Sequence, residues 1–452
     1  MAHFNLLIIG GDAAGMSAAS QARRVDKSLS IGVLEKGEFI SYAACGMPYY
    51  ISGEIKDYTS LLVVEKDEFV TKRNIQIFTG TEAVAADLKA KTVTASSIGK
   101  EIVFTYDKLV IATGAGAVLP PFKGNNLPGV MVLKNLADGI KIRNHIDTLK
   151  PASTVIIGAG LIGLELAEAF VKKGIAVTMI EKAEGLAPAF SDEFRKIIAS
   201  ALSSNGVNAV TGATVNAING TEGNFTVETD KGQFEAEFVV ISTGVRPNTH
   251  FLQNSEIKML GNGAIVVDEK CGTSVPGVLA AGDCATVTNL VTGKTDFIPM
   301  ATNANKQGRV AGLQAAGVKE ELFRGSAGTQ MVKVFELEAA KTGFNRYDAE
   351  RHGIDVIDKF IEWRSRAGYY PGAKSINVKL IVRSDNRKII GAEIAGTDFA
   401  ALRINPVAVA ITAGMTVEDF AYTDFGYSPP FAPVWEPVIA VAQNFIKREK
   451  SG

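Results

Sequence analysis

The sequence predicts an α/β protein built from repeated strand, turn, helix and strand units. An apolar run that ends in glycine occurs twice, as LLIIG at residues 6–10 and as TVIIG at residues 154–158. Each copy continues into an Ala-rich stretch and then into a second apolar run, which is the pattern of a βαβ unit. The length of 452 residues exceeds one ordinary core and predicts about two to four domains.

The composition favours small-molecule partners over nucleic acid or membranes. The formal net charge is -1, and no apolar stretch reaches the roughly 18 residues that a spanning helix needs. Hydrophobic residues make up 46% of the chain, enough for several cores. Three cysteines without metal-ligand spacing predict neither a disulfide scaffold nor a metal site, and they indicate a reducing compartment, interpreted as the cytoplasm.

The first glycine turn predicts a dinucleotide site with one departure from the usual pattern. A helix N-terminus at such a turn binds a pyrophosphate, and an acid at the end of the next strand binds a ribose hydroxyl. Asp12 stands where the middle glycine is expected, so its carboxylate must turn away from the phosphates or cap the helix. The candidate residues of this unit are Gly10, Gly11, Asp12, Ala13, Gly15, Glu35 and Lys36.

The second turn matches the glycine pattern fully and predicts the nicotinamide nucleotide site. Glu181 ends its second strand, and a carboxylate there accepts hydrogen bonds from a free 2′-hydroxyl but repels a 2′-phosphate. This favours NADH, although the adjacent Lys182 leaves NADPH possible. The candidate residues are Gly158, Gly160, Leu161, Ile162, Gly163 and Glu181.

Three further loops follow apolar strands. Thr113-Gly114 and Thr243-Gly244 are interpreted as crossover points between domains. Gly282-Asp283 follows a buried strand late in the chain, where the acid can accept hydrogen bonds from a polyol.

Together these motifs resemble the two-dinucleotide-binding flavoprotein family of pyridine nucleotide-disulfide oxidoreductases, over nearly the whole chain. The resemblance implies two Rossmann-like domains, for FAD and NAD(P), and a C-terminal α+β dimerisation domain. The first unit would bind FAD, with Asp283 at its ribityl or phosphate region. The implied boundaries are residues 1–118 and 248–327 for a split FAD domain, 119–247 for the NAD(P) domain and 328–452 for the dimerisation domain.

Cys45 is the candidate redox residue. A dithiol reductase would carry a second cysteine about four residues away, but Cys271 and Cys284 are distant and are interpreted as buried. The flanking Ala44 and Gly46-Met47-Pro48 predict a helix N-terminus, which would lower the pKa of the thiol. The segment resembles the single-cysteine branch of the family, which comprises coenzyme A-disulfide reductases, NADH oxidases and peroxidases, and persulfide or polysulfide reductases.

That branch implies coenzyme A as substrate or bound adduct, and a homodimer. Tyr369 and Tyr427 would reach the sulfur from the partner subunit, where a phenol can protonate a departing thiolate. The phosphates of coenzyme A need cations, and the basic candidates are Arg23-Arg24, Lys72-Arg73, Lys306 and Arg309. By resemblance the coenzyme A groove is lined by Ser17, Gln21, Arg24, Ser41, Arg73, Asn305 and Arg309.

Several alternatives stay open at this point. Ala44 stands where coenzyme A-disulfide reductases often carry asparagine, so the choice among coenzyme A disulfide, persulfide and polysulfide is undecided. The first turn holds no histidine, which counts against an NADH oxidase or peroxidase that uses a Cys45 sulfenic acid. A reductase of a protein such as rubredoxin and a flavin-based redox sensor are further alternatives. Because the chain stops at Gly452, no appended sulfurtransferase-like domain is expected.

Overall fold

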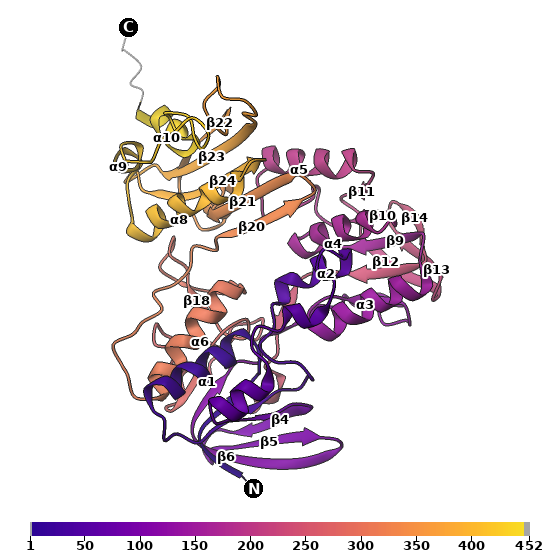
Figure 1. The fold of residues 1–452 in the computed structure, drawn as a ribbon, viewed down its shortest axis with the longest axis vertical. Helices are drawn as coiled ribbons and strands as arrows, with labels where there is room; N and C mark the ends of the chain where they lie inside the picture. Colours follow the sequence, from indigo (N-terminus) through magenta and orange to yellow (C-terminus); the bar gives the residue numbers. More distant parts are fainter. Residues whose placement is uncertain (1, 447–452) are drawn as a thin grey trace.

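The computed structural model describes residues 2–446. Residue 1 and residues 447–452, at the outer ends of the predicted first and last domains, lie outside the described residues. Figure 1 shows three units, with the N-terminal strands at one end and the strands and helices of the last unit at the other. The predicted α/β fold is confirmed, and none of the described helices is long and apolar enough to cross a membrane.

The first unit is a sheet with parallel strands in the order β3-β2-β1-β6, extended by the antiparallel β5 and β4. Strand β17 also pairs with β6, so residues 278–280 add a strand to the sheet that residues 2–111 form. The elements are β1 (Ala2–Ile9), α1 (Ala13–Val25), β2 (Ile31–Leu34), β3 (Ile75–Phe78), β4 (Thr81–Asp87), β5 (Thr92–Ser97), β6 (Lys100–Ile111), β17 (Val278–Ala280) and α6 (Ala301–Ala315).

The segment between β2 and β3 crosses toward the second unit. It contains 3-10 turns at Ala44–Gly46 and Tyr58–Leu61, α2 (Met47–Ser52) and a π-helical turn at Glu68–Lys72. Helix α2 packs against α3 (Leu136–Leu149) and α4 (Leu161–Lys172) of the second unit, where Met47 and Ile51 join its hydrophobic core. This contact carries Cys45 to the junction of the two units.

The second unit is a parallel sheet in the order β11-β10-β9-β15-β8, with an antiparallel β12-β13-β14 layer beside it. Strands β9 and β15 are almost entirely buried, as expected for parallel strands with both faces covered. The elements are β8 (Val130–Val132), α3 (Leu136–Leu149), β9 (Ser153–Ile157), α4 (Leu161–Lys172), β10 (Ala176–Ile180), α5 (Asp192–Ser204), β11 (Asn208–Val210), β12 (Val215–Thr221), β13 (Asn224–Thr229), β14 (Gly232–Ala236) and β15 (Phe238–Ile241).

A short antiparallel pair connects the first two units, formed by β7 (Ala115–Ala117) and β16 (Val245–Pro247). Two small strands, β18 (Val287–Thr288) and β19 (Thr295–Asp296), and a 3-10 turn at His250–Leu252 complete this region. The two segments in which the chain passes between the first and second units therefore lie side by side.

The third unit is an antiparallel sheet in the order β20-β21-β24-β23-β22 with helices on one face. Its core joins the central strands to α8, α9 and α10. The elements are β20 (Gln330–Val334), β21 (Leu337–Gly343), α7 (Arg346–Arg351), β22 (Val356–Arg364), β23 (Ser375–Arg383), β24 (Ile389–Gly396), a 3-10 turn at Ala400–Arg403, α8 (Ile404–Ala413), α9 (Val417–Ala421) and α10 (Pro437–Ile446).

Candidate functional site

One large cavity runs through the junction of the units. Its volume is about 3010 Å³, several times the roughly 300–1,000 Å³ of pockets for single drug-sized ligands. Both glycine turns, both crossover loops, Asp283 and Cys45 line it. The cavity therefore has room for extended ligands that meet at the junction.

The first turn is built so that strand, turn and helix pack without side chains between them. A Cβ atom on Gly15 would lie 1.9 Å from the carbonyl oxygen of Gly10, and Gly10 itself has φ +111. The carboxylate of Glu35 accepts hydrogen bonds from the N–H groups of Gly11 (2.7 Å) and Gly37 (2.6 Å). Of the residues predicted here, Gly15 serves the packing, whereas the cavity is lined by Gly10, Gly11, Asp12, Ala13, Glu35 and Lys36.

Asp12 occupies the N-cap position of α1 but makes no side-chain cap hydrogen bond. Its Oδ1 accepts a hydrogen bond from the N–H of Tyr42 at 3.1 Å. Burial raises the pKa of Asp12 to about 6. Of the two expectations for this residue, the structure follows the first: the carboxylate turns to a neighbouring loop.

The second turn repeats this geometry and leaves a space at its centre. A Cβ on Gly163 would lie 2.2 Å from the Gly158 carbonyl oxygen, whereas nothing lies within 4 Å of one on Gly160. The carboxylate of Glu181 accepts from the N–H groups of Ala159 (2.7 Å) and Ala183 (2.8 Å). Leu161, Ile162 and Lys182 also line the cavity beside this turn.

Each crossover loop is hydrogen-bonded to the segment that follows the other crossover loop. Thr113 donates its hydroxyl hydrogen to the Asn248 carbonyl at 2.8 Å, and Thr243 donates to the Val118 carbonyl at 3.0 Å. Gly114 and Gly244 both line the cavity. These bonds join the two segments in which the chain crosses between the first two units.

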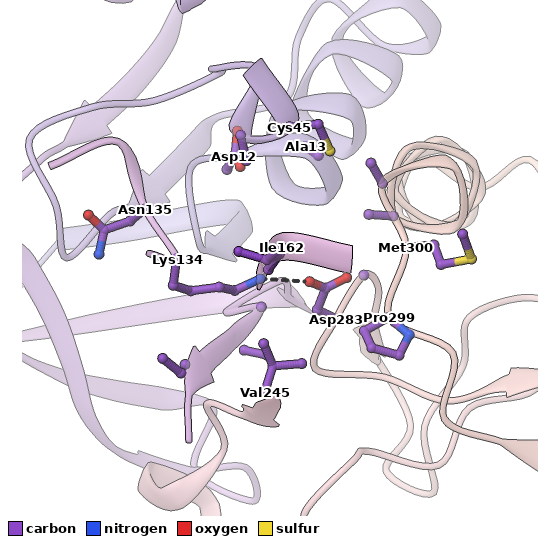
Figure 2. Close-up of a pocket in the computed structure, with 18 of the residues that line it drawn as sticks. Asp12, Ala13, Cys45, Lys134, Asn135, Ile162, Val245, Asp283, Pro299 and Met300 are labelled. Atoms are coloured by element: carbon purple, nitrogen blue, oxygen red, sulfur yellow. Dashed lines mark hydrogen bonds and ion pairs between the residues drawn. The ribbon is translucent and has the colours of Figure 1, made fainter. Parts of the chain in front are cut away.

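Asp283 has a partner that the sequence did not indicate. Lys134 from the loop after β8 lies 3.0 Å from Asp283 Oδ2, and Figure 2 shows the two side chains pointing toward one another in the cavity. Gly282, next to Asp283, donates its N–H to Gln307 Oε1 on α6 at 3.0 Å. A lysine after a short apolar strand is a weak signal, and only the fold brings it to Asp283.

Cys45 is exposed in the 3-10 turn that leads into α2. The predicted position just before a helix is correct, but the predicted lowering of its pKa is wrong. Although the residue as a whole is exposed, the surrounding protein atoms restrict the hydration of its thiolate, and this desolvation raises the pKa of the Cys45 thiol. The carboxylate of Glu165 raises the pKa further, against a smaller opposing effect of Lys134. Helix α2 has 6 residues, too short for its terminus to outweigh these effects.

Glu165 on α4 was missed by the sequence analysis. Burial raises its pKa to about 7, and the residue lines the same cavity as Cys45. Its place two residues after Gly163, near the start of the helix that follows the second nucleotide turn, was the available signal. Cys271 and Cys284 are buried, as predicted, and burial raises the pKa of Cys271 to about 12.

The predicted coenzyme A residues lie along one side of the cavity. Helices α1 and α6 approach closely, since a Cβ on Gly308 would lie 2.2 Å from the Ala14 carbonyl oxygen. Across this contact Ser17 donates its hydroxyl hydrogen to Asn305 Oδ1 at 3.0 Å. The cavity is lined here by Ser17, Gln21, Arg24, Ser41, Arg73, Asn305, Lys306 and Arg309.

Two of the predicted basic residues, Arg23 and Lys72, do not line the cavity. Arg23 is buried and donates to the backbone carbonyls of Arg73, Asp26, Lys27, Leu29 and Asn74. It therefore stabilises the turn after α1 instead of facing the cavity. Lys72 is exposed and pairs with Glu68 at 3.7 Å, outside the cavity lining.

Tyr369 and Tyr427 lie outside the cavity, on the third unit. Their hydroxyl groups are 2.9 Å apart, and the residues are 76% and 46% exposed. Within one chain these tyrosines do not line the space that holds Cys45.

Comparisons with known proteins agree with this architecture. The model of the pyridine nucleotide-disulphide oxidoreductase family matches residues 4–308, and that of the family's dimerisation domain matches residues 329–438. The NAD(P)H coenzyme A polysulfide/persulfide reductase of Pyrococcus horikoshii is 37% identical over 439 residues, which is 97% of this chain and 97% of that protein. The NADH oxidase of Methanocaldococcus jannaschii is 33% identical over 98% of each chain. The structure of the NAD-dependent persulfide reductase from A. fulgidus has a TM-score of 0.95 at 37% identity, covering 98% of this chain and 83% of that chain.

Proposed function

Because the chain belongs to the pyridine nucleotide-disulphide oxidoreductase family, we propose that it is an FAD-dependent NAD(P)H oxidoreductase that reduces coenzyme A disulfide or related persulfides and polysulfides. The observation that carries the proposal is the exposed Cys45 in a cavity that both nucleotide turns and a row of cations also line. A lone sulfur in this position can exchange with a sulfur substrate while it faces the flavin site.

The first unit fits FAD. Because a Cβ on Gly15 would meet the Gly10 carbonyl oxygen, these glycines let β1 and α1 pack closely, and the N-terminus of α1 then borders the cavity, where it can bind a pyrophosphate. The Lys134–Asp283 pair offers a donor and an acceptor to a polyol. When bound, FAD supplies the transfer of electrons between a nicotinamide and sulfur. The residues proposed to hold it are Gly10, Gly11, Asp12, Ala13, Gly15, Glu35, Lys36, Thr113, Gly114, Gly282 and Asp283.

The second unit fits a nicotinamide nucleotide, since the open space at Gly160 can receive a pyrophosphate at the start of α4. Glu181 at the edge of this space favours a free 2′-hydroxyl, hence NADH, with NADPH still accepted beside Lys182. The residues proposed to hold it are Gly158, Gly160, Leu161, Ile162, Gly163, Glu181 and Gly244.

The groove between α1 and α6 is the proposed coenzyme A site. Arg24, Arg73, Lys306 and Arg309 supply positive charge for its phosphates, and Ser17, Gln21, Ser41 and Asn305 supply polar contacts. In a first step the Cys45 thiolate attacks one sulfur of the disulfide, so that a Cys45–coenzyme A mixed disulfide forms and one coenzyme A thiolate leaves. Two electrons from NADH then break this S–S bond, which returns the Cys45 thiolate and releases a second coenzyme A.

We propose a homodimer in which Tyr369 and Tyr427 of one subunit serve the cavity of the other. Their exposed position outside their own cavity supports this arrangement, and a phenol there can donate its proton to the departing thiolate. The buried thiols Cys271 and Cys284 suit a reducing compartment, for which we propose the cytoplasm.

The second candidate function is an NADH oxidase that cycles Cys45 through a sulfenic acid. The identity with the oxidase of M. jannaschii favours it. The absence of histidine from residues 10–15 argues against it, because a base would assist oxygen or peroxide chemistry there.

The experiment is a Cys45→Ser variant combined with intact-mass analysis. We expect the variant to lose at least about 100-fold in reduction of coenzyme A disulfide by NADH, while NADH-dependent reduction of ferricyanide, which needs no thiol, is retained. The wild-type protein incubated with the disulfide should gain the mass of one coenzyme A, which a thiol reductant removes. A gain of one oxygen with fast NADH consumption by oxygen alone would support the oxidase, and undiminished disulfide reduction by the variant would refute both.

A further inference from the structure

The loop that connects β10 to α5, residues 181–191 (the β10–α5 loop), forms one wall of the second nucleotide turn. It starts at Glu181, which binds the N–H groups of Ala159 and Ala183, and its residues Lys182 and Pro188 line the cavity. Ala187 takes a positive φ of 50 and donates its N–H to the Ala159 carbonyl at 3.0 Å. The first part of the loop is thus held by the nucleotide unit itself.

The last part of the loop is held by a different unit, the sheet of the dimerisation domain in the same chain. Ser191 donates its N–H to Glu393 Oε1 at 2.7 Å, and its hydroxyl donates to the other carboxylate oxygen. The carbonyl oxygen of Ala189 accepts from Lys341 Nζ at 2.8 Å and from Asn345 Nδ2 at 3.2 Å. Figure 1 shows α5 beside β21 and β24, and these elements are in contact.

These contacts come from a row of charged side chains on one face of the sheet. Lys341 on β21 and Lys379 on β23 both lie opposite Glu393 on β24. The exposed fractions are 6%, 5% and 1%, so the row is buried. Lys379 binds Glu193 in the first turn of α5 at 3.0 Å and Asp358 at 3.0 Å, whereas Lys341 reaches the β10–α5 loop and Asp348.

Buried charges are a costly way to join two surfaces, because apolar side chains of similar size would stabilise the contact at least as well. Charges and hydrogen bonds do, however, specify one arrangement. A shifted loop would take from Glu393 the hydrogen bonds of Ser191 and would take from Lys341 the Ala189 carbonyl, so that Lys341 kept Asp348 alone among these partners in a low-dielectric interior. Glu393 also takes the place of a capping-box carboxylate at the N-terminus of α5 by accepting the N–H of Ser191, the N-cap residue.

We infer that Lys341 and Glu393 are positioning residues for the nicotinamide nucleotide. They hold Ala189 and Ser191 so that Glu181, Lys182 and Pro188 keep the shape that receives the adenosine ribose. This rests on the proposed function insofar as that function assigns the second turn to NADH. The dimerisation domain thus contributes to nucleotide affinity within its own chain, in addition to any part it has in joining subunits.

The test compares two lysines of the same row. Lys341→Met removes the donor to the β10–α5 loop, and Lys379→Met removes an equally buried lysine that bonds Glu193 and Asp358 but no atom of residues 181–191. Binding of NAD⁺ to the oxidised holoenzyme is measured by titration calorimetry. The dependence of flavin reduction on NADH concentration is measured anaerobically by stopped flow.

We expect Lys341→Met to raise the dissociation constant for NAD⁺ and the half-saturating NADH concentration about tenfold, with the reduction rate at saturating NADH unchanged. Lys379→Met should leave the dissociation constant for NAD⁺, the half-saturating NADH concentration and the saturating reduction rate within about twofold of wild type. It should lower Tm about as much as Lys341→Met does. Equal changes of affinity in both variants, or none in Lys341→Met, would overturn the inference.

Ser191→Ala provides a milder variant if Lys341→Met fails to fold, with an expected increase of about three- to tenfold in the same constants. Neither measurement uses a sulfur acceptor. A failure of the proposed sulfur reduction would therefore leave these binding results unaffected, and the two failures are distinguishable.

Discussion

At Cys45 the surrounding charges work against ionisation. Desolvation by the surrounding protein raises the pKa of the thiol most, and Glu165 raises it further. Lys134 opposes both effects and is itself paired with Asp283. A nucleophilic thiolate at neutral pH therefore needs a change in this balance, such as protonation of Glu165, whose pKa of about 7 makes it titrate in the physiological range. The residue that most affects Cys45 comes from the second unit, 120 positions further along the chain.

The raised pKa of Glu165 predicts a specific dependence of stability on pH. Its value of about 7 exceeds the ordinary 4.5, so the folded protein favours the protonated form. The stabilisation is complete below about pH 4.5 and is lost as the pH rises through about 7. We expect Glu165→Gln to match wild type in Tm at pH 5 and to exceed it by roughly 2–4 °C at pH 8. Equal differences at both pH values, in melting curves that include the exposed Glu65→Gln as control, would contradict this assignment.

Among the elements, the contact between α1 and α6 decides the shape of the proposed coenzyme A groove. Glycines on α6 let the helix axes approach until backbone meets backbone: a Cβ on Gly312 would lie 2.3 Å from the Ala18 carbonyl oxygen. This approach brings Ser17 within hydrogen-bond distance of Asn305. The groove therefore depends on glycines that face no ligand.

We expect Gly312→Ala to push α6 away from α1, because the added methyl group meets a backbone oxygen that cannot move aside. The free energy of unfolding should fall by about 1–3 kcal/mol, and KM for coenzyme A disulfide should rise while KM for NADH is unchanged. Gly261→Ala is the control, since nothing lies within 4 Å of a Cβ there. Denaturant unfolding and steady-state kinetics provide the measurements, and identical effects of both substitutions would refute this view of the helix contact.

For the whole molecule, the third unit presents large apolar side chains to solvent. Phe431 is 77% exposed, Tyr422 73% and Trp435 51%, close in sequence to Tyr427. Large apolar side chains that stay exposed in a single chain are candidates for an interface, and a second copy of the chain would cover them. The proposed active unit is therefore the dimer, with the tyrosine pair carried to the partner's cavity.

Phe431→Asp should convert the dimer to a monomer in analytical ultracentrifugation, because a charge would be buried in the interface. Disulfide reduction should fall about 100-fold or more with the loss of the tyrosines, while ferricyanide reduction by NADH persists. Ile98→Asp is the matched control, an equally apolar side chain that is 97% exposed on the first unit. A Phe431→Asp monomer with full disulfide reductase activity would refute the role of the partner subunit.

Local chemistry made the turns predictable. The glycine turns and the position of Cys45 just before a helix depend on neighbouring residues, and the structure has them as expected. The acids Glu35 and Glu181 each end the strand after such a turn and bond its N–H groups. Arg23 and Arg24 were not distinguishable in this way. Consecutive helical residues point in directions about 100° apart, and only the packing of the whole unit decides which one is buried.

By itself, then, the sequence determined the fold class and the two glycine turns, and it singled out Cys45 as the candidate redox cysteine. Only the tertiary structure decided the Lys134–Asp283 ion pair, the raised pKa of Cys45 and the hydrogen bond from Ser191 to Glu393. Turns follow from backbone sterics over a few neighbouring residues. Charge partners and burial follow from which distant segments pack together, and the free energy of a buried charge depends on those partners.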